Sequence, residues 1–359
     1  MARAVALDAA YFQGVLSVEK TAEGLRPWRL PHIMRHRFDD GLMIKAGCPS
    51  GVRLRFTTDA TALTLRFKPL DEPGPVIPDG HCFDAVIDDR IVQVIRCRGG
   101  ATAAVFDAIG SGRRVVELWL PLDCPVTITE LLAADATTVQ PVPDLRPLWV
   151  TWGSSLTHCV RAGSSARTWP ATVARRHGLN LLNLGFGGQC HLDPTVAMVI
   201  RDLPAQFISL KLGINALINA TVNSRTYTAL VAAAVAIIRE KHPQTPLALV
   251  SPIGFPANET TPNAAGYTVA AMRLDMEFVY NRCVAAGDTN LHYVDGLTIF
   301  NLDEIARYTK DQCHPNAAGI DLMADRFSEL VMWPLQRGLP HDVRHFSINS
   351  TSPSGAQNA

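Results

Sequence analysis

The sequence predicts an α/β protein in two parts, an antiparallel β-sandwich of the jelly-roll type followed by a three-layer α/β/α domain around a parallel sheet. Residues 1 to about 145 contain short segments that alternate polar and apolar side chains, as strands that bury one face do. From Leu148 onward, short apolar segments alternate with longer helical ones. The length of 359 residues fits two domains, since a domain commonly has about 100–200 residues.

The strands of the first part are short and regularly spaced. Turn residues such as Gly, Pro, Asp and Ser separate them, and strands of about five residues at intervals of about 10–20 are typical of a sandwich. No helix longer than two turns is predicted here. The predicted strands are residues 52–56, 63–67, 83–87, 91–96, 114–120 and 126–131.

The second part alternates strands and helices, which predicts βαβ units and a parallel sheet covered on both faces. The predicted strands are 148–152, 181–184, 207–212, 247–251 and 291–294, and the predicted helices are 169–177, 193–201, 226–241, 264–286 and 316–332. A proline-rich linker at 141–147 separates the two parts. We therefore expect a sandwich over residues 1–145, the α/β/α domain over 146–345 and a flexible tail over 346–359.

Composition excludes several classes of protein. The 33 basic and 33 acidic residues give zero net charge, and no cluster of Lys and Arg offers a surface for nucleic acid or an anionic membrane. The longest apolar run, 229–238, is far shorter than the roughly 20 residues that cross a bilayer. The eight cysteines show no CxxC spacing, and the first residues do not resemble a signal peptide. We expect a cytoplasmic protein with reduced thiols.

Polar residues follow the strands of the second part. Ser155, Gly188 and Asn215 come after the first three strands, and Asp311 and His314 precede the last helix. The carboxyl ends of parallel strands meet at one edge of a sheet, where ligands bind. Together these residues supply a hydroxyl, backbone donors, an amide and a carboxylate–imidazole pair, as nucleophilic catalysis by serine requires.

Each residue type has a chemical reason. A serine hydroxyl becomes nucleophilic when a base takes its proton, and His314 is the candidate base because histidine as a residue type commonly serves as a general base. Asp311, three residues earlier, can fold back and orient the ring. The amides of Ser155 and Gly188 and the side chain of Asn215 can stabilise the oxyanion of a tetrahedral intermediate. No metal is expected.

Four segments resemble the sequence blocks of the SGNH (GDSL-type) hydrolases, in that family's order. The first departs from Gly-Asp-Ser-Leu because Ser154 replaces the aspartate, and the third has Ala216 where the family often has Asp. The four segments are 153–157, 183–188, 213–215 and 311–314. The resemblance implies a flavodoxin-like SGNH domain.

The resemblance also implies the residue roles. Ser155 would be the nucleophile, His314 the base and Asp311 its partner, with Gly188 and Asn215 as oxyanion donors beside the Ser155 amide. A sandwich before such a domain resembles a subgroup that contains carbohydrate esterases and an acyltransferase of antibiotic biosynthesis. The subgroup implies transfer of an acyl group, for example an aromatic one such as salicylyl, from an ester or acyl-CoA to a small-molecule hydroxyl.

Two alternatives of function stay open. A GDSL-type esterase that deacylates carbohydrates or small molecules would use the same residues, and only the acceptor distinguishes it from a transferase. A non-catalytic carbohydrate-binding protein would need a row of aromatic side chains on the sandwich, which the sequence lacks. The expected cytoplasmic location favours the transferase. No cofactor is expected, with acyl-CoA as a candidate co-substrate, and the oligomeric state stays open.

Simpler interpretations exist for single residues. Ser155 is also a good helix N-cap, the glycines suit tight turns, and Asp311 to His314 suit a surface turn. Phe186 and Trp169 are candidates to line an acyl pocket, with core packing as the alternative. Three Cys–His neighbours, at 158–159, 190–191 and 313–314, suggest soft-metal ligands but lack zinc-site spacing. His158 and His191 are reserve candidates for the base.

Overall fold

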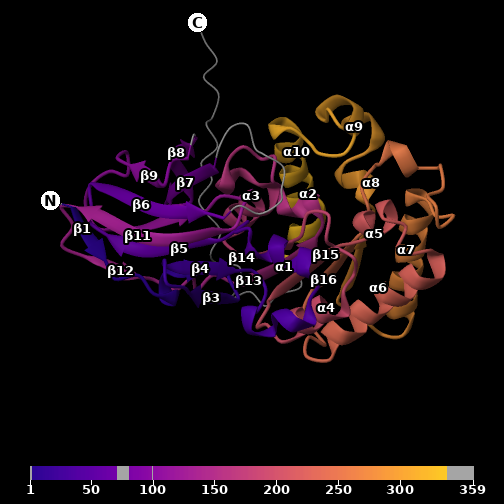
Figure 1. Ribbon diagram of the computed structural model, residues 1–359. Coiled ribbons are helices and arrows are strands. Elements are labelled where there is room, and N and C mark those ends of the chain that lie inside the picture. Colours follow the sequence, from indigo (N-terminus) through magenta and orange to yellow (C-terminus); the bar gives the residue numbers. More distant parts are fainter. Residues whose placement is uncertain (1, 71–80, 99, 338–359) are drawn as a thin grey trace, which may run out of the picture.

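The computed structural model describes residues 2–70, 81–98 and 100–337. Two antiparallel sheets form one side of the molecule, and a parallel sheet between helices forms the other (Figure 1). The predicted tail, 346–359, lies outside the described residues. Among the described helices, none has the length and apolar character needed to cross a bilayer.

The predicted sandwich is confirmed. In the described residues its first sheet has the order β3-β4-β11-β6-β9, with β1 beside β11, and its second has the order β12-β5-β10-β7-β8, with β2 beside β5. Alternate residues of the longer strands face a common core, as Leu63, Leu65 and Phe67 do on β6. The strands are β1 (Ala2–Val5), β2 (Phe12–Gln13), β3 (Ser17–Lys20), β4 (Leu25–Trp28), β5 (Arg53–Thr58), β6 (Ala62–Pro69), β7 (His81–Ile87), β8 (Arg90–Cys97), β9 (Ala103–Phe106), β10 (Arg114–Trp119), β11 (Val126–Ala134) and β12 (Val139–Pro141).

The prediction that this part has no helix longer than two turns is wrong. Helix α1 (Asp40–Gly47) has eight residues, slightly more than two turns. Asp39 caps it by accepting hydrogen bonds from the amides of Gly41 and Leu42. Its apolar residues pack into a core shared with the second part, and such tertiary packing is what stabilises a short helix.

The parallel sheet is confirmed, and its strand order is β14-β13-β15-β16-β17. This is the flavodoxin-like order 2-1-3-4-5, in which the first strand lies between the second and the third. The carboxyl end of β13 is therefore the point where the chain direction around the sheet reverses, and ligands bind there. The strands are β13 (Leu148–Gly153), β14 (Asn180–Gly185), β15 (Phe207–Lys211), β16 (Leu247–Val250) and β17 (Leu291–Val294).

Helices cover both faces of this sheet. One face packs against α1, α4, α6 and α7, and the other against α3 and α10. The predicted helix at 316–332 begins as α10 and continues as a π-helical turn, η5 (Ser328–Met332). The helices are α2 (Ser155–His158), α3 (Trp169–Arg176), α4 (Pro194–Arg201), α5 (Ile214–Ile218), α6 (Ser224–Arg239), α7 (Val269–Ala285), α8 (Gly296–Ile299), α9 (Leu302–Tyr308), α10 (Ala317–Phe327) and α11 (Trp333–Arg337).

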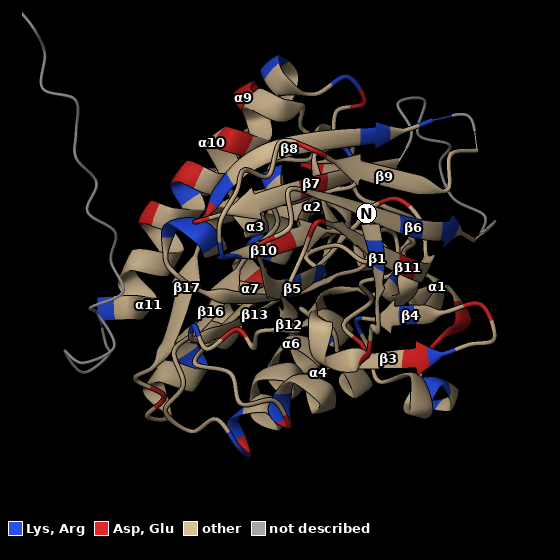
Figure 2. Cartoon of the chain, turned by 90° about the vertical axis from the view of Figure 1, so that its left-hand side faces the viewer, with Lys and Arg blue, Asp and Glu red and all other residues tan. Residues whose placement is uncertain are grey.

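Charged residues are dispersed over the fold. Figure 2 shows basic and acidic positions interspersed along strands and helices of both parts. The dispersion agrees with the zero net charge of the chain.

Candidate active site

Ser155 lies directly beyond the carboxyl end of β13. The N-cap of α2 is Ser154, whose side chain accepts from the Leu156 amide, and Ser155 is the first residue of that helix. The N-cap alternative therefore applies to Ser154, and the Ser155 hydroxyl is available to other groups. It lies 2.9 Å from Nε2 of His314.

Asp311 and His314 form the rest of a hydrogen-bonded series. Nδ1 of His314 lies 2.9 Å from Oδ2 of Asp311. The other carboxylate oxygen accepts from the backbone amides of Cys313, at 3.1 Å, and His314, at 2.8 Å. The turn therefore holds the carboxylate in place and directs the ring toward Ser155.

The electrostatics keep this carboxylate ionised. Burial acts to raise the pKa of Asp311, but hydrogen bonds from the backbone and ring of His314 outweigh it and lower the pKa to about 2. Nη1 of Arg161 also lies 2.9 Å from Oδ2, on the solvent side. An ionised Asp311 stabilises an imidazolium at His314.

Three candidate oxyanion donors lie beyond the carboxyl ends of β13, β14 and β15. The Ser155 amide, as the first of α2, has no intrahelical acceptor. The amide of Gly188 has no hydrogen-bond partner among the described residues, and the adjoining Gly187 packs against Ser155. Asn215 is buried on α5, and its Oδ1 accepts from the Cys190 amide at 3.2 Å, which directs the NH₂ group away from that loop.

His158 supports the loop that carries Gly188. Its Nε2 lies 2.8 Å from the carbonyl oxygen of Leu122, and its Nδ1 accepts from the Gly187 amide at 3.4 Å. Burial, helped by the charge of Arg29, lowers the pKa of His158 well below its usual value, so the ring is neutral. Both ring nitrogens are thus occupied by backbone groups.

The other reserve base, His191, contacts Thr221 and Asn219 at the surface, each at 3.2 Å. Neither reserve histidine is hydrogen-bonded to Ser155. Among the described residues, none of the three Cys–His neighbours belongs to a three-ligand grouping that could hold a metal.

Phe186 and Trp169 lie in the core. Both are fully buried. Arg29 stacks over the Phe186 ring, and Trp169 packs against Trp149 and Phe327 while its Nε1 donates to the carbonyl of Leu156 at 2.7 Å. Their position corresponds to the packing alternative, and Trp169 supports the helix that begins at Ser155.

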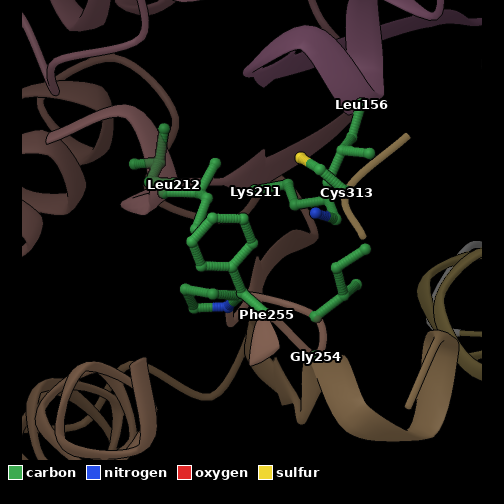
Figure 3. Close-up of a pocket in the computed structure, with 9 residues that line it drawn as sticks. Leu156, Lys211, Leu212, Gly254, Phe255 and Cys313 are labelled. Carbon is green, nitrogen blue, oxygen red and sulfur yellow. The ribbon is translucent and has the colours of Figure 1, made fainter. Parts of the chain in front are cut away.

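Two pockets flank the Ser155–His314 pair. One contains Ser155 and His314 themselves, with Val160, Arg161 and Met323 along its wall. The other is lined by Leu156, Lys211, Ile214, Ile253, Phe255 and Cys313, among others (Figure 3). Lys211 and Arg161 were not among the site residues predicted from the sequence. A lysine in the strand 207–212, whose other residues are apolar except for Ser209, was the available signal for Lys211.

The fold and the site together define an enzyme of acyl chemistry. The chain belongs to the GDSL-like lipase/acylhydrolase family, whose model matches residues 147–332. Residues 10–125 match a second model, described as the SsfX3 N-terminal domain. The predicted family and the predicted enzyme class are therefore confirmed.

Solved structures resemble this chain along most of its length. The chain is 31% identical to the salicylyl-acyltransferase SsfX3 from a tetracycline biosynthetic pathway, with a TM-score of 0.84 over 93% of this chain and 98% of that one. A GDSL-like lipase from Bacteroides ovatus is 20% identical (TM-score 0.75, 90% and 95% covered). A family two carbohydrate esterase from Clostridium thermocellum is 16% identical (TM-score 0.61, 80% and 93% covered). These last two share the fold, and no curated protein sequence matches.

Proposed function

We propose that the protein is an O-acyltransferase that forms an acyl-enzyme on Ser155 and passes the acyl group to a small-molecule hydroxyl. The observation that carries the proposal is the hydrogen-bonded series from Asp311 through His314 to Ser155, with 2.9 Å at both steps. Such a series activates a serine hydroxyl, which is a weak nucleophile by itself.

The proposed reaction has two matched halves. Ser155 Oγ attacks the carbonyl carbon of an ester or acyl-CoA thioester, and its proton passes to Nε2 of His314. The oxyanion is held by the amides of Ser155 and Gly188 and by Asn215 until the alcohol or thiol leaves with that proton. In the second half His314 takes the proton of the acceptor hydroxyl, whose oxygen attacks the acyl-enzyme. Collapse releases the new ester and returns the proton to Ser155.

The similarity to a salicylyl-acyltransferase along nearly the whole chain, sandwich included, supports transfer and suggests an aromatic acyl group such as salicylyl. Hydrolysis is the alternative, in which water replaces the acceptor, and the carbohydrate esterases of the same fold favour it. In either reaction the chain supplies nucleophile, base and donors, so the chemistry calls for no cofactor. Acyl-CoA as donor and a cytoplasmic location stay predictions.

Trapping the acyl-enzyme tests the assignment. With an activated ester such as a 4-nitrophenyl ester, intact-protein mass spectrometry should show one acyl adduct, located on the peptide that contains Ser155. Ser155→Ala should abolish the adduct and lower turnover by at least ~10³-fold. Ser154→Ala is the matched control, because it removes the neighbouring hydroxyl and should keep the adduct. An adduct that persists in Ser155→Ala would contradict the proposal.

Product partition then separates transfer from hydrolysis. The acylated protein is mixed with candidate alcohols, and ester and free acid are quantified. A transferase should give mainly ester at an acceptor concentration far below that of water. Free acid as the main product with every alcohol would favour the esterase.

A further inference from the structure

Lys211 is a buried cation in an apolar strand. It is the last residue of β15, every residue of which is buried, and only 4% of its surface is exposed. Its ammonium makes no hydrogen bond or ion pair with any other described residue. Burying a charge without a partner is costly, and such groups mark functional sites.

The side chain lines the pocket next to the candidate nucleophile. Figure 3 shows Lys211 beside Cys313, with Leu156 and Phe255 on either side. Leu156 follows Ser155 in the chain, and Cys313 precedes His314. Ile214, which precedes Asn215, also lines the pocket. The pocket is thus built from the immediate neighbours of three candidate catalytic residues.

The other groups that face Lys211 leave its charge uncompensated. Burial raises the pKa of the Cys313 thiol to about 11, and burial also raises that of Cys190, so both are neutral at pH 7. Burial lowers the pKa of Lys211 to about 8, which still leaves the ammonium as the main form at pH 7. The rest of the named lining is apolar.

We infer that Lys211 is a specificity-determining residue that binds a negatively charged or hydrogen-bond-accepting oxygen carried by the acyl group on Ser155. The ammonium would pair with the oxygen substituent of that group, and the apolar side chains beside it would contact the adjoining carbon atoms. A hydroxyl on an aromatic acyl group and the free carboxylate of a dicarboxylic acyl group both offer this chemistry. A plain acetyl group offers none and leaves the cation unpaired. The inference rests on the proposed function and adds its substrate class.

Matched pairs of 4-nitrophenyl esters test it by kcat/KM. The pairs are 2-hydroxybenzoate against benzoate, and the glutarate monoester against pentanoate. The wild type should prefer the oxygen-bearing member of at least one pair by about tenfold or more, since a hydrogen bond to a charged group is involved. The pair that shows the preference identifies the source of the oxygen.

Removing the amine should remove the preference. In Lys211→Met the ratio should fall to near one, because the variant keeps the volume and apolar character of the stem but loses the ammonium. Lys241→Met, at an exposed lysine, is the control and should keep the wild-type ratio. Equal ratios in wild type and Lys211→Met, or no preference in either pair, would overturn the inference.

A binding measurement separates this inference from the proposed function. Calorimetry compares 2-hydroxybenzoate and glutarate binding to Ser155→Ala and to Ser155→Ala/Lys211→Met, neither of which needs to turn over. The double variant should bind about tenfold more weakly. Unchanged binding would refute the role of Lys211 even if Ser155 is acylated. The melting temperature of Lys211→Met should equal or exceed that of the wild type, since an unpaired buried charge is lost, whereas a purely structural lysine would lower it.

Discussion

The sandwich and the parallel-sheet part differ in the role of their buried polar residues. Every candidate catalytic side chain comes from the parallel-sheet part. The sandwich part contributes none, yet its buried polar residues bond to the loops that hold them. Arg29, next to β4, donates from Nη1 to the carbonyls of Asn183, at 2.8 Å, and Gly185, at 2.6 Å. These residues lead into the Gly187–Gly188 turn.

Ser50 and Leu122 extend this support. Ser50 donates to the carbonyl of His158 at 2.8 Å and accepts from the Asn183 side chain at 3.0 Å. The carbonyl of Leu122 bonds to the His158 ring. The sandwich therefore supplies part of the frame that holds the Gly187–Gly188 turn. The parallel-sheet part supplies the candidate catalytic groups, and the sandwich part supports them.

The largest effect is expected for a candidate catalytic residue of the parallel-sheet part. Asn215→Ala removes one oxyanion donor and should lower kcat by about 10²–10³, equivalent to about 3–4 kcal/mol of transition-state stabilisation, with little change in KM. Steady-state kinetics with a 4-nitrophenyl ester measure this. Asn219→Ala, at the end of the same helix, is the control and should stay near wild type. A loss below about threefold in Asn215→Ala would remove it from the proposed oxyanion hole.

The next largest effect is expected for a supporting residue of the sandwich part. Arg29→Met leaves four carbonyl oxygens, those of Lys45, Cys48, Asn183 and Gly185, without this donor. The free energy of unfolding should fall by about 3 kcal/mol, and kcat by about tenfold at a temperature where the protein stays folded. Denaturant titration and kinetics measure the two. Arg26→Met, at a partly exposed neighbour, should change neither much. Full activity with lost stability would show that the contacts of Arg29 do not affect the candidate active site.

The seam between the two parts should respond to acid. Asp144 lies 2.5 Å from Nη2 of Arg53 on β5 and 2.6 Å from Nη2 of Arg146, and the same Arg53 nitrogen donates to Asn180 on β14 at 2.8 Å. Burial alone would raise the pKa of Asp144, but hydrogen bonding to Arg146 and the charges of both arginines hold its pKa well below the usual range.

The direction of the pH effect on stability follows from the lowered pKa of Asp144. The unfolded chain binds the proton first, so the ionised pair stabilises the fold fully above about pH 4–5 and less as the pH falls toward the folded pKa. The contribution is on the order of 2 kcal/mol. Asp144→Asn should be less stable at pH 7 and lose stability less steeply between pH 5 and 2.5, as followed by thermal unfolding. A slope equal to that of the wild type would show that other carboxylates dominate acid unfolding.

These contacts also explain what the sequence could predict. The candidate site could be predicted from the sequence because its residues follow or precede recognisable elements in a known order. These residues are Ser155, Gly188, Asn215 and the Asp311–His314 pair. The antiparallel and the parallel sheet could also be predicted, because each leaves a pattern in the local sequence. The roles of Arg29 and helix α1 could not be predicted, because some of their partners, such as Asn183 and Gly185 for Arg29, lie more than a hundred residues away in the chain, and only the fold brings them together.

Lys211 shows the same limit in the active-site part. A single lysine at the end of an apolar strand has many ordinary explanations. Its significance depends on a pocket that four separate chain segments enclose, at Leu156, Lys211 to Ile214, Ile253 and Cys313. The local sequence pattern identifies the reacting groups. Tertiary contacts decide which residues support those groups and which substrate the site recognises.

The smallest expected effect tests whether position in the parallel-sheet part is itself enough to affect chemistry. Asn223 is the N-cap of α6, in a capping box with Thr226, at an exposed helix end. Asn223→Ala should lower the free energy of unfolding by about 1 kcal/mol and leave kcat/KM unchanged. Asn223→Asp, which keeps a capping oxygen, should stay close to wild type. Helix α6 packs on the sheet, and this cap makes no bond to a catalytic loop. A loss of activity in the alanine variant would therefore mean that the site depends on the stability of the whole parallel-sheet part. The specific bonds from Arg29, Ser50 and Leu122 would then not be what the site depends on.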